Sequence, residues 1–275
     1  MKTLAFFAVF LLIFVTYSII IISIYYQEAA KLGEVIAVLS GKGGTGKTSI
    51  CAAVAAALSN DGHRVLCVDC DVGLRNLDIS LGLSSQPVLS FLDICQGSYA
   101  LTSLMPHPRF PNLYFLTAPM NRSIDDIDPQ AFEQLVLSAR TLYDYVLLDA
   151  PAGVDAGFRL AASKADRVLL VTGSDPASIR DAGHTASVLE LMGKTNIRLI
   201  VNRISPRLVS TMNLTIDDVM DDTGLPLIGV VPEDHHVILA AAFGQSLLEY
   251  SKKGAAAACR RIASRIQGMP VKIDL

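Results

Sequence analysis

Residues 41–49, with the sequence GKGGTGKTS, constrain the fold of this chain more than any other segment. They follow an aliphatic run of strand type at residues 35–39 and lead into an alanine-rich stretch of helix type. The pattern G-x-x-x-x-G-K-[ST] in this context is that of a loop whose backbone N–H groups surround phosphates. It predicts a nucleotide-binding α/β domain, with Lys47 on the β- and γ-phosphates and Thr48 on Mg²⁺.

The chain after residue 32 repeats the order strand, loop, helix. The expected strands are aliphatic runs at residues 35–39, 65–68, 113–116, 145–148, 167–171, 198–201 and 227–230. The expected helices lie at residues 48–59, 131–139, 156–163, 177–191, 215–221 and 247–266. Apolar strands that alternate with helices indicate a mostly parallel sheet with helices on both faces. We therefore predict a single α/β domain of the P-loop NTPase class over residues 33–268, followed by a short tail, 269–275.

Composition and charge exclude several classes of protein. Apolar residues make up 51% of the 275 positions and charged residues 18%, which suits a chain with a large buried core. The net charge of −3 argues against general binding of nucleic acid, which requires a basic surface.

Five scattered cysteines indicate a reduced chain with buried thiols. Cys67 and Cys70 form a CxxC pair, which in other settings holds a metal or a redox centre. The sequence has no second CxxC, and the pair spans the end of a strand, so the two side chains are expected to face different ways. We favour buried thiols over a metal site.

Residues 4–26 are almost wholly apolar and uncharged, and this stretch is long enough to cross a bilayer. Residues 1–32 are therefore a hydrophobic extension with a transmembrane span, or a segment that is not translated. Their Phe, Ile, Leu and Tyr codons are A/T-rich, whereas the Ala-, Gly- and Arg-rich remainder is G/C-rich. Codons for residues 27–29 can contain a ribosome-binding sequence just before a start codon at Leu32. The genomic DNA upstream of codon 32 distinguishes a translated transmembrane span from an untranslated segment.

Aspartates follow two of the expected strands. Asp69 and Asp71 come after residues 65–68, and Asp149 ends the run at residues 145–148, as in a Walker B segment. Carboxylates at this edge of the sheet can hold Mg²⁺ or orient a water molecule. For Asp69 and Asp71, position alone favours a helix cap and a loop.

Lys42 gives the phosphate loop a second lysine, and the resulting KGGTGKT resembles the deviant Walker A family of MinD, ParA, Mrp and nitrogenase iron proteins. In that family, the residue that matches Lys42 reaches across a dimer to the other subunit's nucleotide. A cation delivered in this way stabilises charge that develops on the phosphate. The resemblance implies that ATP joins two subunits and that hydrolysis releases them. Without it, Lys42 would be a solvated loop lysine.

Two further segments resemble the switches of this family. Residues 71–78, DVGLRNLD, are similar to switch I of its MinD members, which implies that Asp71 orients the attacking water and that Asp69 and Asn76 support the switch. Residues 149–153, DAPAG, are similar to switch II, with Ala150 in place of a serine. This match implies that the Gly153 N–H senses the γ-phosphate and that Asp149 holds Mg²⁺ through water.

The resemblance covers nearly all of residues 34–268 and supplies a set of site residues. It implies that Asn202 recognises adenine, with a second base-binding stretch around Pro232. The implied catalytic residues are Lys42, Lys47 and Asp71. The implied nucleotide-binding residues are Gly41, Lys42, Gly43, Gly44, Thr45, Gly46, Lys47, Thr48, Ser49, Gly153, Asn202, Arg203, Pro232, Glu233 and Asp234. The implied metal ligands are Thr48, Asp69 and Asp149.

The function implied by the resemblance is that of a Mg²⁺-dependent ATPase that forms a homodimer with ATP. Such a switch places the bacterial division septum with a MinC-type inhibitor and a MinE-like or other specificity partner, in the cytoplasm and at the inner face of the cell membrane. Two alternatives stay open. One is a related ATPase that positions flagella, chromosomes or plasmids; the other is an Mrp-like iron–sulfur carrier, against which the missing carboxyl-terminal cysteine pair counts.

The carboxyl terminus departs from the family pattern. MinD members usually end in a short amphipathic helix that binds membrane in the ATP dimer. Here the last helix is expected to pack its apolar face on the core and to leave a basic face in solvent. The apolar face carries Ala255, Cys259, Ile262 and Ile266, and the bases are Arg260, Arg261 and Arg265. Residues 269–275 are too short to form the usual tail, which leaves the route to the membrane open.

Overall fold

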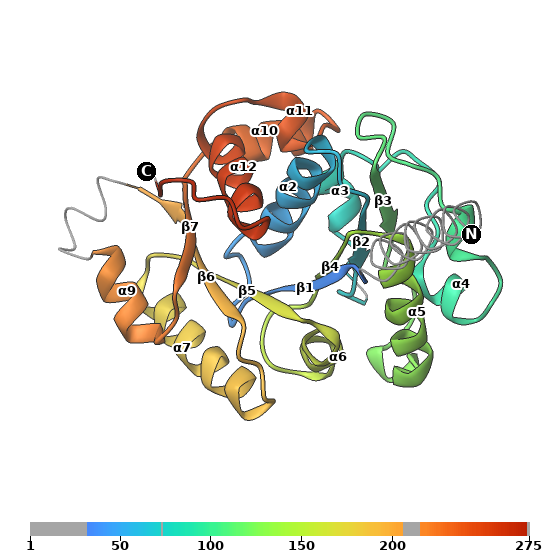
Figure 1. Ribbon diagram of the computed structural model, residues 1–275, viewed down its shortest axis with the longest axis horizontal. Coiled ribbons are helices and arrows are strands. Elements are labelled where there is room, and N and C mark those ends of the chain that lie inside the picture. The colour runs from blue at the N-terminus through green and yellow to red at the C-terminus, as the bar shows by residue number, and fades with distance from the viewer. Residues whose placement is uncertain (1–31, 73, 206–214, 274–275) are drawn as a thin grey trace, which may run out of the picture. The chain divides into compact units, whose positions relative to one another are not determined.

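A computed structural model describes residues 32–72, 74–205 and 215–273 (Figure 1). The chain divides into two units, Met1–Leu32 and Gly33–Leu275. The hypotheses on residues 1–31 lie outside the described residues, as does Gly73 of the switch I match. Among the described residues, no helix is both long and apolar enough to span a membrane.

Within the described residues, seven strands form one parallel sheet in the order β3-β2-β4-β1-β5-β6-β7. The strands are β1 (Glu34–Leu39), β2 (Val65–Asp69), β3 (Leu113–Leu116), β4 (Tyr145–Asp149), β5 (Arg167–Thr172), β6 (Ile197–Ile204) and β7 (Leu227–Pro232). All seven predicted strands are confirmed, and so is the predicted α/β class. The central strand β1 lies between β4 and β5, so the chain leaves the middle of the sheet at the start of the phosphate loop.

Helices cover both faces of the sheet, as predicted (Figure 1). One face carries α2 (Lys47–Asn60), α3 (Leu77–Leu81), α10 (His236–Ala242), α11 (Leu247–Tyr250) and α12 (Gly254–Ile266). The other carries α4 (Phe91–Cys95), α5 (Pro129–Leu142), α6 (Ala156–Lys164), α7 (Pro176–Leu191) and α9 (Ile216–Thr223). Alternation along β1 explains the two cores: Val35 and Ala37 face one, and Ile36 faces the other.

The prediction of one continuous helix over residues 247–266 is wrong. The structure has two helices, α11 and α12, separated by an extended segment around Lys253. Gly254 has a φ of 55°, and a Cβ there would collide with the Asp234 carboxylate. The helix is therefore interrupted where the backbone passes close to the Asp234 carboxylate, although the sequence keeps a helical pattern. The sequence also gave no signal for the short helices α3, α4 and α10.

Two predictions about side-chain burial are confirmed. Helix α12 packs Ala255, Cys259, Ile262 and Ile266 into the core, each at most 4% exposed. Cys67 and Cys70 point to opposite faces of the sheet, because they belong to different cores. All five cysteines lie in the described residues as free thiols.

Candidate nucleotide site

The phosphate loop has the strand–loop–helix form that the sequence predicts. β1 ends at Leu39, residues 40–46 turn, and α2 begins at Lys47. Gly44 and Gly46 have φ angles of 81° and 86°, which side chains rarely allow. A Cβ at Gly46 would also collide with the amide of Asn202, so glycine is required there. The loop conformation thus depends on contact with the end of β6.

Lys47 and Asp149 form a buried ion pair beneath the loop. The Lys47 Nζ lies 2.7 Å from Asp149 Oδ1 and 3.4 Å from Thr48 Oγ1. Burial raises the pKa of Asp149, and Lys47 opposes that rise. Burial alone would lower the pKa of Lys47, but the charge and the hydrogen bond of Asp149, with smaller effects of Cys51 and Asp71, together outweigh burial and raise the pKa. Lys47 therefore stays charged where a phosphate would meet it.

Asp69 is completely buried at the carboxyl end of β2, in register with Asp149 on β4. Its Oδ1 accepts the Asp71 N–H at 3.0 Å, and its Oδ2 accepts the Asn76 and Leu77 N–H groups, both at 3.2 Å. Burial and the Asp149 charge raise the pKa of Asp69 to about 7. These bonds suit the expected support of switch I; the role of Asp69 as a metal ligand stays a prediction.

A cavity of about 570 Å³ lies over the loop. Residues of the loop, of the segment after β2 and of the segment after β4 line it together, so the structure brings the two predicted switches to the phosphate loop. Asp71 is partly buried in this cavity, where burial raises its pKa and Lys47 opposes the rise. The Gly153 N–H donates to the Ser40 carbonyl at 3.0 Å. A contact from Gly153 to a γ-phosphate would require this bond to break.

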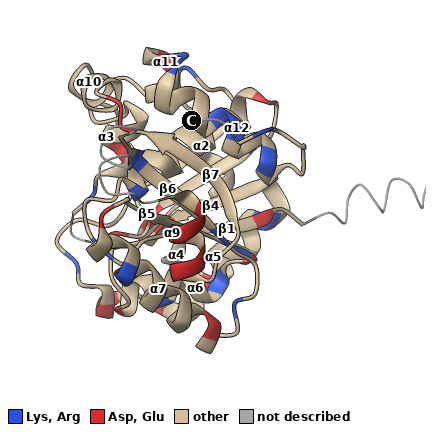
Figure 2. Ribbon diagram, turned by 90° about the vertical axis from the view of Figure 1, so that its left-hand side faces the viewer, with Lys and Arg blue, Asp and Glu red and all other residues tan. Residues whose placement is uncertain are grey.

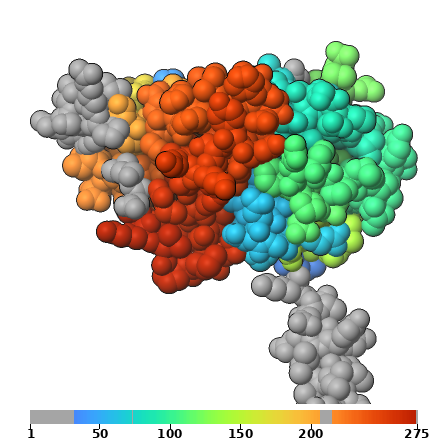
Figure 3. All heavy atoms as spheres, turned by 90° about the horizontal axis from the view of Figure 1, so that it is seen from above, coloured from blue at the N-terminus to red at the C-terminus, as the bar shows by residue number. Residues whose placement is uncertain are grey.

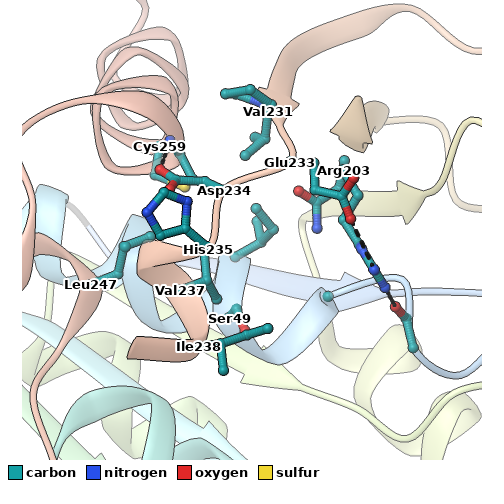
Figure 4. Close-up of a pocket in the computed structure, with 16 residues that line it drawn as sticks. Ser49, Arg203, Val231, Glu233, Asp234, His235, Val237, Ile238, Leu247 and Cys259 are labelled. Atoms are coloured by element: carbon teal, nitrogen blue, oxygen red, sulfur yellow. Dashed lines mark hydrogen bonds and ion pairs between the residues drawn. The ribbon is translucent and has the colours of Figure 1, made fainter. Parts of the chain in front are cut away.

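A second cavity, of about 400 Å³, lies on the other side of the loop (Figure 4). The predicted base-binding residues line it: Asn202, Arg203, Pro232, Glu233 and Asp234. Figure 4 shows Arg203 and Glu233 on one side and His235, Val237 and Leu247 on the other. Gly44, Gly46 and Ser49 line both cavities, so the two are contiguous across the phosphate loop.

The polar residues of the second cavity are held by specific bonds. Asn202 is buried, and its Nδ2 donates to the Thr45 carbonyl at 2.7 Å. This bond leaves Oδ1 as an acceptor, which complements an exocyclic amine such as that of adenine. Arg203 Nη2 pairs with Glu233 Oε1 at 3.2 Å. Asp234 instead directs its carboxylate to the Ala255 and His236 N–H groups, each at 2.9 Å.

Lys42 differs from Lys47 in its surroundings. Its Nζ lies 3.7 Å from Asp175 Oδ1, and the two side chains are 46% and 55% exposed. Asp175 is mainly occupied with the first turn of α7, where it accepts bonds from the Ser178 N–H and hydroxyl. Lys42 is thus held loosely at the surface, in a position from which it can reach another molecule.

Sequence reasoning missed the apolar lining of the base cavity. Ile50, Val231, Val237, Ile238 and Leu247 contribute most of it, together with the imidazole of His235. These residues come from four separate elements and form no motif. The only available signal was the position of residues 235–238 directly after the matched stretch around Pro232.

The fold and the two cavities define a P-loop nucleotide-binding protein, and comparisons with known proteins place it more narrowly. Residues 36–248 match the family described as the CobQ/CobB/MinD/ParA nucleotide binding domain. The chain is 36% identical to the septum site-determining protein MinD of Synechocystis sp., over 87% of this chain and 91% of that protein. It is 35% identical to MinD of Thermotoga maritima, over 88% and 91%.

Solved structures agree with the sequence relatives. The MinC:MinD cell division protein complex of Aquifex aeolicus has a chain with a TM-score of 0.81 and 34% identity, covering 88% of this chain and 99% of that one. MinD complexed with Mg-ADP from Pyrococcus horikoshii has a TM-score of 0.75 and 28% identity, covering 86% and 96%. The chain belongs to the MinD group of the CobQ/CobB/MinD/ParA family of nucleotide-binding ATPases.

Proposed function

We propose that this protein hydrolyses ATP as a dimerisation switch of the MinD type and helps to place the division septum by recruiting a MinC-type inhibitor. The observation that carries the proposal is the pair of cavities that share Gly44, Gly46 and Ser49. A nucleotide across the loop has its base beside Asn202 and its terminal phosphate beside Asp71. That is the arrangement a nucleotide-dependent switch requires, because the switch segments then contact only the phosphate end.

The residues around Lys47 fit a Mg²⁺ ion. The Thr48 hydroxyl and the Asp149 carboxylate offer oxygen ligands, which Mg²⁺ prefers, close to the expected phosphates. A bound Mg²⁺ would neutralise phosphate charge. We propose Thr48 as a direct ligand and Asp149 as a ligand through water, while the Lys47 ammonium would contact the phosphates. The Asp69 carboxylate accepts three backbone N–H groups around switch I, which supports a role in ordering that segment; its role as a metal ligand stays a prediction.

Hydrolysis in this proposal requires residues of both subunits. Asp71 lies in the phosphate cavity with its carboxylate partly solvated, as a group that orients water must be. Lys42 is exposed, and its Nζ lies 3.7 Å from Asp175. Breaking this exposed ion pair so that Lys42 can contact the phosphates of a second subunit therefore requires little free energy. The ATP-bound homodimer is therefore the active form, and the monomer turns over slowly.

The partners and the location follow from the proposed switch. A MinC-type inhibitor binds the ATP dimer, and a MinE-like or other partner stimulates its hydrolysis. The protein works in the cytoplasm and peripherally at the inner membrane face, through its amino-terminal segment or a partner. Nucleic acid is an unfavourable partner, since α9 presents four exposed aspartates in a cluster (Figure 2): Asp217, Asp218, Asp221 and Asp222.

The experiment that tests this proposal measures assembly with each nucleotide. Light scattering after size exclusion should give a dimer with ATP and a monomer with ADP. The MinC-type protein of the same genome should co-elute with the ATP form alone. A monomer in both states would refute the dimerisation switch, whereas a dimer that ignores the MinC-type protein would redirect the proposal to another positioning system. Co-sedimentation of the chain from Leu32 onward with anionic liposomes, with ATP and with ADP, then tests whether these residues bind membrane without the amino-terminal segment.

A further inference from the structure

Three consecutive residues at the start of α10, two of which also line the base cavity, bring metal-ligating side chains together. Asp234, His235 and His236 follow the end of β7, and one ligand-type atom from each lies within 4.8 Å of the others. They belong to the carboxyl-terminal segments that cover much of the face seen in Figure 3, in orange to red. Within the described part of the chain, they are the one such group of three.

Asp234 is fixed before any ligand arrives. Its side chain is only 7% exposed, and its Oδ2 accepts the Ala255 N–H while its Oδ1 accepts the His236 N–H. The left-handed Gly254 lets the chain pass against the carboxylate. The carboxylate therefore needs little further ordering to act as a ligand.

The two imidazoles lie beside this carboxylate and are open to solvent. The His236 Nδ1 is 2.6 Å from Asp234 Oδ1, and the two ring centroids are 4.3 Å apart with planes tilted by 31°. The His236 side chain is 38% exposed, and His235 is exposed as well. An ion can reach the group from solution, with water completing its coordination.

We propose that Asp234, His235 and His236 bind a divalent transition metal ion of the Zn²⁺ type. Two imidazole nitrogens and one carboxylate oxygen suit Zn²⁺ or Co²⁺, whereas Mg²⁺ prefers oxygen ligands only. Ligands about 2.1 Å from a tetrahedral ion lie about 3.4 Å apart. The three ligand atoms already lie within 4.8 Å of one another, so small rotations of the two partly exposed imidazoles are enough to bring them to this spacing. This site is separate from the Mg²⁺ site proposed at Thr48 and Asp149.

An ion bound at this site would stabilise the junction between β7, α10 and α12. Asp234 holds the first turn of α12, His236 begins α10, and His235 lines the base cavity. An ion shared by the three residues links the end of β7 to both helices. The folded chain holds the Asp234 carboxylate in place, so it should bind the ion more tightly than the unfolded chain does, and the ion should raise the Tm.

The experiment titrates ZnCl₂ into the full-length, tag-free and nucleotide-free protein by calorimetry, with excess MgCl₂ present. The variants are His235→Gln and His236→Gln, and the matched control is His184→Gln, which removes an exposed histidine on α7. We expect one ion per chain in the wild type and the control. Each test variant should bind it at least about tenfold more weakly, having lost a ligand. Zn²⁺ should raise the Tm of the wild type and not of the test variants.

A second readout identifies the ligands. Co²⁺ in place of Zn²⁺ should give the intense visible absorption of a tetrahedral site in the wild type, and His235→Gln should abolish it. An absence of Zn²⁺ binding, or equal binding by all four proteins, overturns the proposal. If His236→Gln fails to fold because Asp234 loses a partner, the exposed His235 still decides the question, provided that its variant has the wild-type Tm without zinc.

Discussion

Lys42 and Lys47 lie five positions apart on one loop, yet the structure gives them opposite surroundings. Lys47 is buried with its Nζ 2.7 Å from Asp149, whereas Lys42 is 46% exposed with its Nζ 3.7 Å from Asp175. Removing one partner of a buried pair leaves an uncompensated charge, whereas an exposed pair contributes little. The comparison teaches that burial separates the two lysines: Lys47 is held inside its own subunit, whereas Lys42 is exposed at the surface, where the proposed contact with a second subunit requires it to be.

The largest effect is expected from Lys47→Ala. It removes the charge that meets the phosphates and leaves Asp149 buried without a cation. Nucleotide affinity should fall by more than about 100-fold, since several charge-assisted bonds are lost together. Calorimetric titration with ADP and Mg²⁺ measures it, and Lys42→Ala is the matched control. Tight binding by Lys47→Ala would mean that the loop does not hold the phosphates.

Lys42→Ala should affect turnover while sparing binding. Affinity for ADP should stay within about threefold of the wild type, because the Lys42 contact is exposed. The ATP-dependent dimer should be lost, and turnover should fall by about 1,000-fold, as when a cation supplied in trans is removed. Light scattering and phosphate release report the two effects. A normal ATP dimer in this variant would show that Lys42 does not act across subunits.

Asp71→Ala sharpens the comparison by separating assembly from hydrolysis. The loss of the group that orients water should lower turnover by about 100-fold or more. Lys47 and Lys42 are both intact, so the variant should bind ATP and remain a dimer after the wild type has returned to monomers. Time-resolved light scattering with ATP follows this difference. Dimers that decay at the wild-type rate would remove Asp71 from the reaction.

The smallest effect is expected from Asp175→Asn. This change removes the negative charge that pairs with Lys42 in the same chain. Asparagine caps helices as well as aspartate does, so α7 should keep its first turn. Nucleotide affinity should change by less than about threefold, and ATP-dependent dimerisation should become slightly more favourable because Lys42 is released. Dimer dissociation constants with ATP provide the measurement. A large loss of stability would show that the exposed pair matters more than its geometry indicates.

Local sequence patterns predicted most of the fold, but not the break between α11 and α12 or the short helices. The strands could be located because a strand buried on both faces must be apolar throughout, as in residues 35–39. The break before α12 could not, since residues 247–266 keep a helical pattern and the interruption depends on Asp234, which is distant in sequence. Short helices such as α3 carry too few residues for their periodicity to be recognised.

The sequence by itself determined the phosphate loop and the order of the strands along the chain. These features are local, because glycine and lysine at fixed spacings and apolar runs carry their own chemistry. The two switches were predicted from the resemblance to a known family, and the roles of their residues stay predictions. The tertiary structure alone decided which charges are buried and which are free. Asp69 accepts hydrogen bonds from backbone N–H groups, Lys47 forms an ion pair with Asp149, and Asp234 accepts a hydrogen bond from the first turn of α12. Burial and partner choice depend on elements that meet only when the sheet is assembled, so residue spacing cannot reveal them.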